Sequence, residues 1–387
     1  MRLVMTMMVR DEADVIEAMV THHFAQGVDT ILVTDNGSVD GTAEILERLA
    51  DSHDIVLMHD PVHAKQQSKC VTRMANQAYT DYRADWVINA DADEFWVPRS
   101  HETLHQAFET YPKRYEAFQV HVEDMTGLPA AQGTGLGRLI YRDLRPTTML
   151  RGVGLRDHST PDAVHVGADG IEVVQGNHAV SLASKGAPDP DQSVEVLHFP
   201  WRSWEQFRRK VENAGSAYES NPTLKPSPNH HGMRDYKLLK SGKLLASYLL
   251  RSLTEAQLAE GIDAGIYAQE TRIRDEDLPQ VEDSPLEFDP VEMVGQLRDL
   301  AAAQGQRLAE VAASADQQIA DARARVEALR QEWEQERDEL HATEVRLHQR
   351  VEAASDQLTA ARIELQNLRN RPYVKVARSA SRLLHRS

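Results

Sequence analysis

Cysteine is almost absent from this sequence, because Cys70 is the only one among 387 residues. A single cysteine excludes an internal disulfide framework and a zinc site built from several thiolates. Since chains without disulfides are typical of reducing compartments, we predict a cytoplasmic location for this protein.

A long apolar run is absent as well. The segment Met1–Val9 is apolar, but it is far shorter than the roughly 20 residues of a membrane-spanning helix, and acidic residues follow it at once. We therefore interpret this segment as a buried strand. We expect no membrane-spanning helix elsewhere, because no other stretch is long and apolar enough.

Basic residues are in deficit. The chain has 43 Lys and Arg against 60 Asp and Glu, which gives a formal net charge of −17. Phosphate contacts with nucleic acid need Lys and Arg in excess, so this composition excludes general nucleic-acid binding. An anionic sugar nucleotide can still bind to such a chain if a divalent cation lies between the two.

Apolar, β-branched runs alternate with helical patterns over residues 1–100. This alternation predicts βαβ units and a mostly parallel sheet, with ligands beyond the carboxyl ends of its strands. The expected strands are Leu3–Val9, Thr30–Thr34, Ile55–His59 and Trp86–Asn89, and the expected helices are Glu12–Gln26, Thr42–Ala50 and Lys69–Tyr79.

The patterns weaken after residue 115. We expect strands over Ala117–Val122, near Met149 and over Ile171–Val174, a helix over Trp204–Ala214, a connector over 221–232 and two helices within 236–275. The sequence therefore predicts an α/β domain followed by a small helical region.

The composition changes near Val294. From there to Leu368 no proline occurs, and apolar residues recur in steps of three and four, as in the seam of a coiled coil. They are Leu308, Val311, Ala315, Ile319, Ala322, Val326, Leu329, Trp333, Leu340, Leu347, Val351, Ala354, Leu358, Ala361, Leu365 and Leu368. We predict a homo-oligomer joined by this coiled coil. The alternative is one amphipathic helix packed on the globular part.

We divide the chain into four parts: an α/β domain at 1–220, a connector and helical adjunct at 221–290, a coiled coil at 291–368 and a tail at 369–387. Beyond Pro372 the tail contains four basic residues, several apolar ones and no acidic residue. Such a segment can bind an anionic membrane surface, which predicts a peripheral contact with the plasma membrane. The alternative is a solvated terminus.

The most specific chemical pattern is Asp91-Ala92-Asp93, which comes directly after the strand expected at Trp86–Asn89. Two carboxylates separated by one residue at a strand end can converge on one cation, and Mg²⁺ and Mn²⁺ prefer oxygen ligands. A cation held there would neutralise a diphosphate as its bond to a sugar breaks. The alternative is an acidic loop without a ligand, because such triplets are frequent.

A second polar turn, Asp35–Thr42, follows the second expected strand. A carboxylate and an amide at a strand end can bind the polar edge of a nucleobase, and the helix that follows begins with an N-terminus that favours anions. The alternative is a helix-capping turn without a ligand.

Four motifs in this order resemble family 2 glycosyltransferases, in particular the branch whose metal motif is Asp-Ala-Asp-Glu-Phe. They are Val9-Arg10-Asp11-Glu12-Ala13, Thr21-His22-His23 ahead of Gly27-Val28-Asp29, the Asp35–Thr42 turn and Ala90-Asp91-Ala92-Asp93-Glu94-Phe95. The resemblance covers residues 1–215 and implies a GT-A fold, a nucleotide-diphosphate-sugar donor and Mn²⁺ or Mg²⁺. It also implies that Arg10, Glu12, Asp35 and Asn36 line the nucleotide pocket, that Asp91 faces ribose and metal, and that Asp93 binds the metal.

The segment Val196–Ser203 is similar to the same branch, which implies that His198 completes the metal site. The alternative is a structural histidine bonded to a backbone carbonyl. Arg202 and Lys210 follow, and we interpret them as possible contacts of the diphosphate.

Family 2 enzymes invert the anomeric centre, which implies a carboxylate that deprotonates the acceptor hydroxyl. Glu123-Asp124 has the letters of the usual base motif, but it ends an early strand. Asp157, Asp169 and Glu172 lie at more suitable distances from His198 along the chain, and we predict Asp157 as the base.

These observations together predict an inverting, metal-dependent transferase that moves a sugar to a glycan or glycolipid acceptor of the cell surface. Two alternatives stay open. One is a nucleotidyltransferase, although the Gly-rich phosphate loop typical of that class is absent from the N-terminal region. The other is a catalytically weak scaffold that works through its coiled coil.

Overall fold

The computed structural model describes residues 1–61, 67–155, 157–219 and 231–371. Two compact units make up the chain: Met1–Gly305, and a second one that begins at Gln306. The first unit contains the α/β sheet with its helices, and the second consists of the continuation of one long helix.

The N-terminal half of the sheet is parallel, as predicted. Strand β1 pairs with β2 on one side and with β4 on the other, and β2 pairs with β3. The strands are β1 (Leu3–Val9), β2 (Thr30–Asp35), β3 (Ile55–His59) and β4 (Trp86–Asn89), and the helices between them are α1 (Ile16–Ala25), α2 (Thr42–Ala50) and α3 (Gln67–Thr80). The predicted α/β class and mostly parallel mixed sheet are confirmed.

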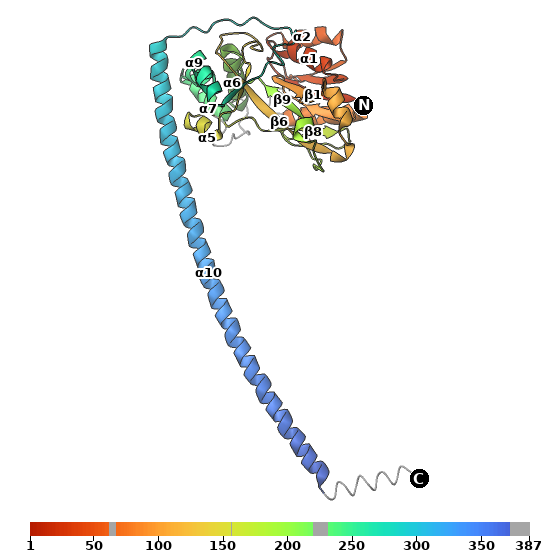
Figure 1. Ribbon diagram of the computed structural model, residues 1–387, viewed down its shortest axis with the longest axis vertical. Coiled ribbons are helices and arrows are strands. Elements are labelled where there is room, and N and C mark those ends of the chain that lie inside the picture. The colour runs from red at the N-terminus through yellow and green to blue at the C-terminus, as the bar shows by residue number, and fades with distance from the viewer. Residues whose placement is uncertain (62–66, 156, 220–230, 372–387) are drawn as a thin grey trace, which may run out of the picture. The chain divides into compact units, whose positions relative to one another are not determined.

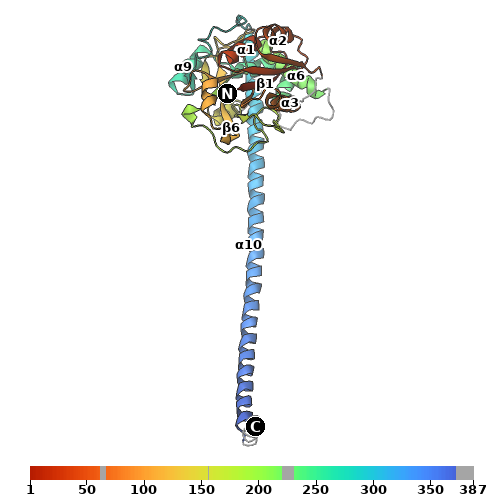
Figure 2. The same ribbon diagram turned by 90° about the vertical axis from the view of Figure 1, so that its right-hand side faces the viewer.

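Helices cover both faces of this sheet (Figures 1 and 2). Leu3 and Met5 of β1 pack in the cluster that contains α1, α2 and the short helix α4 (Leu104–Thr110). Val4, which points to the opposite face, packs against α3. Because both faces are buried, the parallel strands are apolar on both sides, which is why they read as continuous apolar runs.

The second half of the sheet is mainly antiparallel. Its strands are β5 (Glu94–Pro98), β6 (Ala117–Thr126), β7 (Tyr141–Asp143), β8 (Asp162–Val166), β9 (Val194–His198) and β10 (Tyr267–Gln269). The order along the sheet is β10-β7-β6-β8-β4-β1-β2-β3, and β9 pairs with both β5 and β6. Strand β9 therefore connects the segment after the Asp-Ala-Asp motif to the end of β6.

Three local predictions were wrong. The segment around Met149 forms the helix α5 (Thr147–Gly152), which begins directly after Pro146, instead of a strand. Ile171–Val174 contains no strand but only a single bridge, between Val173 and Val180. Instead of two helices, 236–275 contains the second half of α7 (His231–Lys240), α8 (Leu244–Arg251), α9 (Glu255–Asp263) and β10.

Helix α6 (Trp204–Glu219) confirms the helix expected at Trp204 and extends it. It packs with α7 and α8 around Phe207, Tyr236 and Tyr248. Helix α6 also contacts the carboxyl end of the sheet, because its Lys210 donates a hydrogen bond to Asp93 and its Asn213 donates one to Asp11.

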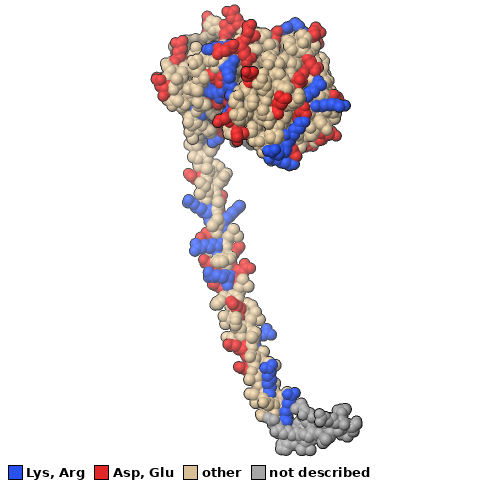
Figure 3. Space-filling view, turned by 45° about the vertical axis from the view of Figure 1, so that its right-hand side comes forward, with Lys and Arg blue, Asp and Glu red and all other residues tan. Residues whose placement is uncertain are grey.

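Helix α10 (Pro290–Asn370) is continuous over 81 residues. Asp289 caps it by accepting the backbone N–H of Val291 at 2.8 Å. Its apolar side chains are exposed over the second unit, where charged residues of both signs lie along the helix (Figure 3). Within the described residues, no helix combines the length and the apolar character needed to cross a bilayer. The basic tail lies outside the described residues from 372 onward.

Candidate active site

The carboxyl ends of β1 and β2 bring together three residues predicted for the nucleotide pocket. Arg10 Nη1 donates to the carbonyl oxygen of Asn36 at 2.5 Å, and Asn36 Nδ2 donates to the carbonyl oxygen of Asp60 at 2.8 Å. The Asp35 carboxylate accepts the backbone N–H of Gly37 at 3.1 Å. Arg10, Asp35 and Asn36 thus share one edge of the sheet, and their role toward a nucleotide stays a prediction.

Glu12 lies on the loop after β1, where its partner is the fully buried Arg202. Arg202 Nη2 donates to Glu12 Oε2 at 2.5 Å, and its Nε donates to Asp14 Oδ2 at 2.7 Å. Burial raises the pKa of Glu12 to about 7, although the charges of Arg202 and Lys210 oppose the increase. With its guanidinium held by these carboxylates, Arg202 links the β1–α1 loop to the site, and we interpret it as a structural residue.

We expect Arg202→Met to lower the free energy of unfolding by about 3–5 kcal/mol, the range typical of removing one partner of a buried ion pair. Glu12 and Asp14 would then be left without their cation. Urea unfolding followed by circular dichroism measures the change. Arg208→Met is the matched control, because Arg208 lies on the exposed face of α6 with its side chain 41% accessible. Equal stability of the two variants would contradict the role given to Arg202.

Asp91 lies two residues after the end of β4. Its Oδ1 accepts hydrogen bonds from Gln67 Nε2 at 2.7 Å and from Asn177 Nδ2 at 3.1 Å. Burial, and then the charge of Asp93, raise the pKa of Asp91 to about 6. The two carboxylates therefore lie close enough to repel each other, which favours a cation between them.

Asp93 is almost completely buried and is surrounded by cations. Its Oδ2 lies 2.7 Å from Lys210 Nζ, and 3.6 Å from both His198 Nε2 and Arg202 Nη1. Burial alone would raise the pKa of Asp93, but Lys210, His198 and Arg202 outweigh it and hold the pKa well below its usual range. Asp93 is therefore the anionic centre of the site.

His198 ends strand β9, opposite Glu94 of β5 and Asp124 of β6. Its Nδ1 lies 2.8 Å from Asp124 Oδ1 and donates to it, since a carboxylate only accepts. Its Nε2 is thereby left to face Asp93. Burial lowers the pKa of His198, but Asp93 and Asp124 outweigh it and raise the pKa to about 10.

Asp91, Asp93 and His198 fit a divalent cation by their chemistry. Two carboxylates and an imidazole suit Mn²⁺, and a carboxylate on the second ring nitrogen is the usual support of a histidine ligand. Over the described ranges, however, no three His, Cys, Asp or Glu side chains form a ready metal-binding group. Lys210 neutralises Asp93 in this arrangement, so a cation would have to replace that contact.

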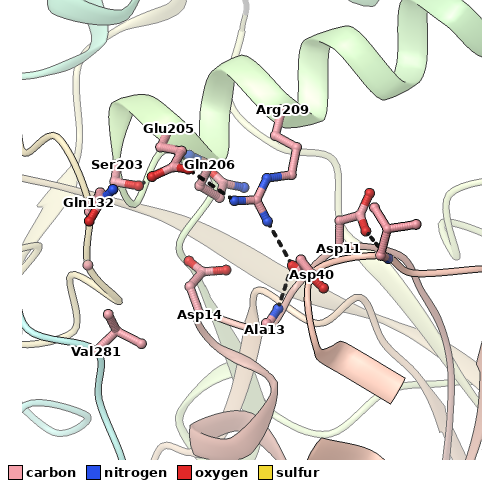
Figure 4. A pocket seen from close by; sticks show the side chains of 12 residues that line it. Asp11, Ala13, Asp14, Asp40, Gln132, Ser203, Glu205, Gln206, Arg209 and Val281 are labelled. Atoms are coloured by element: carbon pink, nitrogen blue, oxygen red, sulfur yellow. Dashed lines mark hydrogen bonds and ion pairs between the residues drawn. The ribbon is translucent and has the colours of Figure 1, made fainter. Parts of the chain in front are cut away.

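A separate hollow of about 520 Å³ lies between the β1–α1 loop, the start of α2 and α6. Figure 4 shows Arg209 reaching from α6 toward Asp40, with the Asp14 side chain to one side of this pair. Arg209 Nη1 donates to Asp40 Oδ2 at 2.8 Å, and Asp40 also accepts the backbone N–H of Ala13 at 3.1 Å. These contacts fix the turn that follows β2, and the residues that line the hollow do not include the metal motif.

Asp157, the predicted base, is paired with Arg151, whose Nε donates to Asp157 Oδ1 at 2.7 Å. Its side chain is 41% accessible, and its role stays a prediction. Asp124 was not predicted as a site residue, yet it contacts both His198 and Ser159. The sequence indicated Asp124 only through the Glu123-Asp124 pair, which resembles the usual base motif. The pairing of β6 with β9 is what brings Asp124 next to His198.

The comparison with family models finds one match at this domain. Residues 5–161 match the model described as "Glycosyl transferase family 2", which is less than half of the chain. The matched segment includes the ends of β1, β2 and β4 and the residue pair Glu123-Asp124, and it ends just before Asp162.

Solved structures that resemble the chain include TarS of S. aureus, at 12% sequence identity and a TM-score of 0.31, covering 65% of this chain and 43% of TarS. TarS 1-349 in complex with UDP-GlcNAc matches at 11% identity and a TM-score of 0.33, covering 65% and 72% of the two chains. Glucosyl-3-phosphoglycerate synthase from Mycobacterium tuberculosis, in complex with Mn²⁺, UDP and glucosyl-3-phosphoglycerate, matches at 15% identity and a TM-score of 0.23, covering 43% and 56% of the two chains. The chain thus spans less than half of the first of these TarS chains, and scores this low carry no argument about its ligands. No curated protein matches the chain.

Proposed function

We propose that this chain, a glycosyltransferase with a family 2 domain over residues 5–161, moves a sugar from a nucleoside-diphosphate sugar to an acceptor hydroxyl with inversion. The observation that carries the proposal is the position of His198. Its Nδ1 is fixed by Asp124 while its Nε2 faces Asp93, at the carboxyl edge of β4. This is the edge where α/β sheets bind their ligands.

We assign a divalent cation, Mn²⁺ or Mg²⁺, to Asp91, Asp93 and His198. When bound, the cation supplies neutralisation of the diphosphate as the sugar leaves it. The protein's own residues prepare the site: Gln67 orients Asp91, and Asp124 holds His198 in one tautomer.

The donor nucleotide is assigned to the ends of β1 and β2. Arg10, Asp35 and Asn36 offer a guanidinium, a carboxylate and an amide there, which together can bind a base and its ribose. Glu12 supports this pocket through Arg202. The acceptor is proposed to be a glycan or glycolipid.

Thermal unfolding with a panel of sugar nucleotides tests this function, since a ligand that binds only the folded state raises its melting temperature. We expect stabilisation by at least one sugar nucleotide with Mn²⁺ and slow release of its nucleoside diphosphate. Release of pyrophosphate from a nucleoside triphosphate would favour a nucleotidyltransferase instead. A protein that associates but binds no sugar nucleotide would favour the scaffold.

We expect Asp124→Asn to weaken Mn²⁺ binding by about 10- to 100-fold, the usual effect of removing a carboxylate behind a histidine ligand. The Nδ1–H of His198 would then donate to a neutral amide, which orients the ring less firmly. Titration of Mn²⁺ followed by electron paramagnetic resonance of the free ion measures the affinity. Glu123→Gln is the control, because the Glu123 side chain pairs with His121 and Arg142 instead. Equal Mn²⁺ affinities of the two variants would contradict the assignment of His198 to the proposed metal site.

We propose a homo-oligomer through α10, whose apolar residues are exposed. The boundaries at 220, 290 and 368, the cytoplasmic location and the membrane contact of the tail stay predictions.

A further inference from the structure

The triplet Gly176-Asn177-His178 forms a tight turn between β8 and β9. The backbone N–H of Asn177 donates to the Val174 carbonyl at 3.1 Å, and Gly176 and Asn177 have φ values of +83° and +62°. A positive φ is uncommon for a residue other than glycine, and such conformations cluster at functional sites. Asn177 is also almost completely buried, which is unusual for a turn.

Asn177 connects this turn to the metal motif. Its Nδ2 donates to Asp91 Oδ1 at 3.1 Å, whereas its Oδ1 is buried and has no hydrogen-bond partner among the described residues. A buried acceptor without a partner costs about 1–3 kcal/mol and calls for an explanation. The turn is therefore anchored directly beside the proposed donor site.

Asp162 lies next to this turn at the first position of β8. Because Ile88 of β4 pairs with Val164 of β8, the antiparallel register places Asp162 alongside Ala90, at the edge where Asp91 follows. The Asp162 side chain is fully buried, and its Oδ2 has no hydrogen-bond partner in the described ranges. A buried carboxylate in this state needs a hydrogen-bond donor as its partner, and the one beside it is a histidine.

His178 supplies that partner. Its Nδ1 lies 3.1 Å from Asp162 Oδ1, and the pairing leaves its Nε2 as an acceptor. The side chain is 43% accessible, so a substrate can reach it. The ring folds over Gly176, where an added Cβ would lie 2.8 Å from Nε2, and the positive φ of Gly176 itself favours glycine.

We propose that His178, positioned by Asp162, is the general base for the acceptor, in the role predicted for Asp157. The inference rests on the proposed function. His178 Nε2 takes the proton of the acceptor hydroxyl while the acceptor oxygen bonds to the anomeric carbon. The bond from that carbon to the diphosphate oxygen breaks, and the nucleoside diphosphate leaves with the electron pair. Asp162 stabilises the imidazolium until its proton passes to water.

Asp157 is less suited to this role. Its carboxylate is held at the surface by the Arg151 guanidinium, which donates to both of its oxygens. In His178, Nδ1 is paired with the Asp162 carboxylate and Nε2 is left as the acceptor. This is the arrangement of a base with an orienting group.

The test compares His178→Gln, His178→Ala, Asp162→Asn and Asp157→Asn in the full-length chain. Hydrolysis of a sugar nucleotide that stabilises the wild-type protein is measured from pH 5 to pH 9, with thermal stabilisation by the same compound as the binding readout. His121→Gln is the matched control, because His121 is an accessible histidine that also faces a carboxylate, Glu123, at 3.3 Å.

We expect His178→Gln to lower kcat by about 10²- to 10⁴-fold, the usual contribution of a general base, with stabilisation retained. The increase of rate with pH should vanish, imidazole in the buffer should restore part of the rate of His178→Ala, and His121→Gln should behave as wild type. Rates of both His178 variants within threefold of wild type would overturn the inference, as would loss of the pH dependence in Asp157→Asn alone. A wild-type protein that neither binds nor hydrolyses any sugar nucleotide would instead overturn the proposed function, and this inference with it.

Discussion

Replacing Asp93 by asparagine should lower metal-dependent turnover of the sugar nucleotide by about 10³-fold or more, because the amide removes the negative charge on which the cation depends. Asp93 is the carboxylate nearest to His198 Nε2, and it also balances Lys210. The side chain of asparagine has almost the same shape, so the effect of charge is separated from that of volume. Initial rates of nucleoside-diphosphate release with Mn²⁺ measure the change.

Folding has to be controlled in this experiment, since the same substitution leaves the buried Arg202 and Lys210 short of one anion. The melting temperature of the metal-free variant shows whether the domain still folds. Asp81→Asn, at an exposed position after α3, is the matched control and should retain the wild-type rate. Turnover of Asp93→Asn at the wild-type level would contradict the assignment of the metal site.

Two glutamates placed in the apolar seam of α10 should convert the protein from an oligomer to a monomer of 43.5 kDa. The seam residues Val326, Leu329 and Val351 are each about two-thirds exposed in the single chain. Proteins seldom leave so long an apolar stripe uncovered, so we expect a second copy to bury it. Unpaired charges in the buried seam cost about 3–5 kcal/mol each, enough to weaken association at least a hundredfold.

The variant is Leu329→Glu with Val351→Glu, measured by light scattering behind size-exclusion chromatography. The control is Ala328→Glu with Ala353→Glu, which adds the same charge one and two positions away, outside the seam. We expect the control to keep the mass of the wild-type oligomer, and both variants to keep wild-type turnover per chain. A monomeric wild-type protein, or equal masses for both variants, would show that α10 does not join the copies.

The parallel half of the fold was predictable because its pattern is local. The strands at Leu3–Val9, Ile55–His59 and Trp86–Asn89 begin and end as expected, since each is an apolar run that is followed by a polar segment. The antiparallel half was not predictable to the same extent. Strand β10 has three residues and pairs with β7, more than a hundred residues earlier in the sequence, and no local pattern encodes that pairing.

The same contrast holds for the site. Asp91 and Asp93 follow a strong strand signal and could be named from the sequence. Asp124 and Asp162 could not, because their places depend on the register of β6 against β9 and of β8 against β4. Met149 illustrates the opposite error: a strand was expected near this residue, whereas Pro146 directly precedes a helix there, as proline is well suited to do.

Calorimetric titration of nucleoside diphosphates into the full-length protein tests the central claim most directly, with Mn²⁺ present and with the ion removed by EDTA. The claim is that a cation at Asp91, Asp93 and His198 allows this acidic chain to bind a diphosphate. We predict binding of at least one nucleoside diphosphate with Mn²⁺, at least about tenfold weaker binding with EDTA, and no effect of EDTA in Asp93→Asn. Equal affinity of the wild-type protein with and without Mn²⁺ would contradict the account.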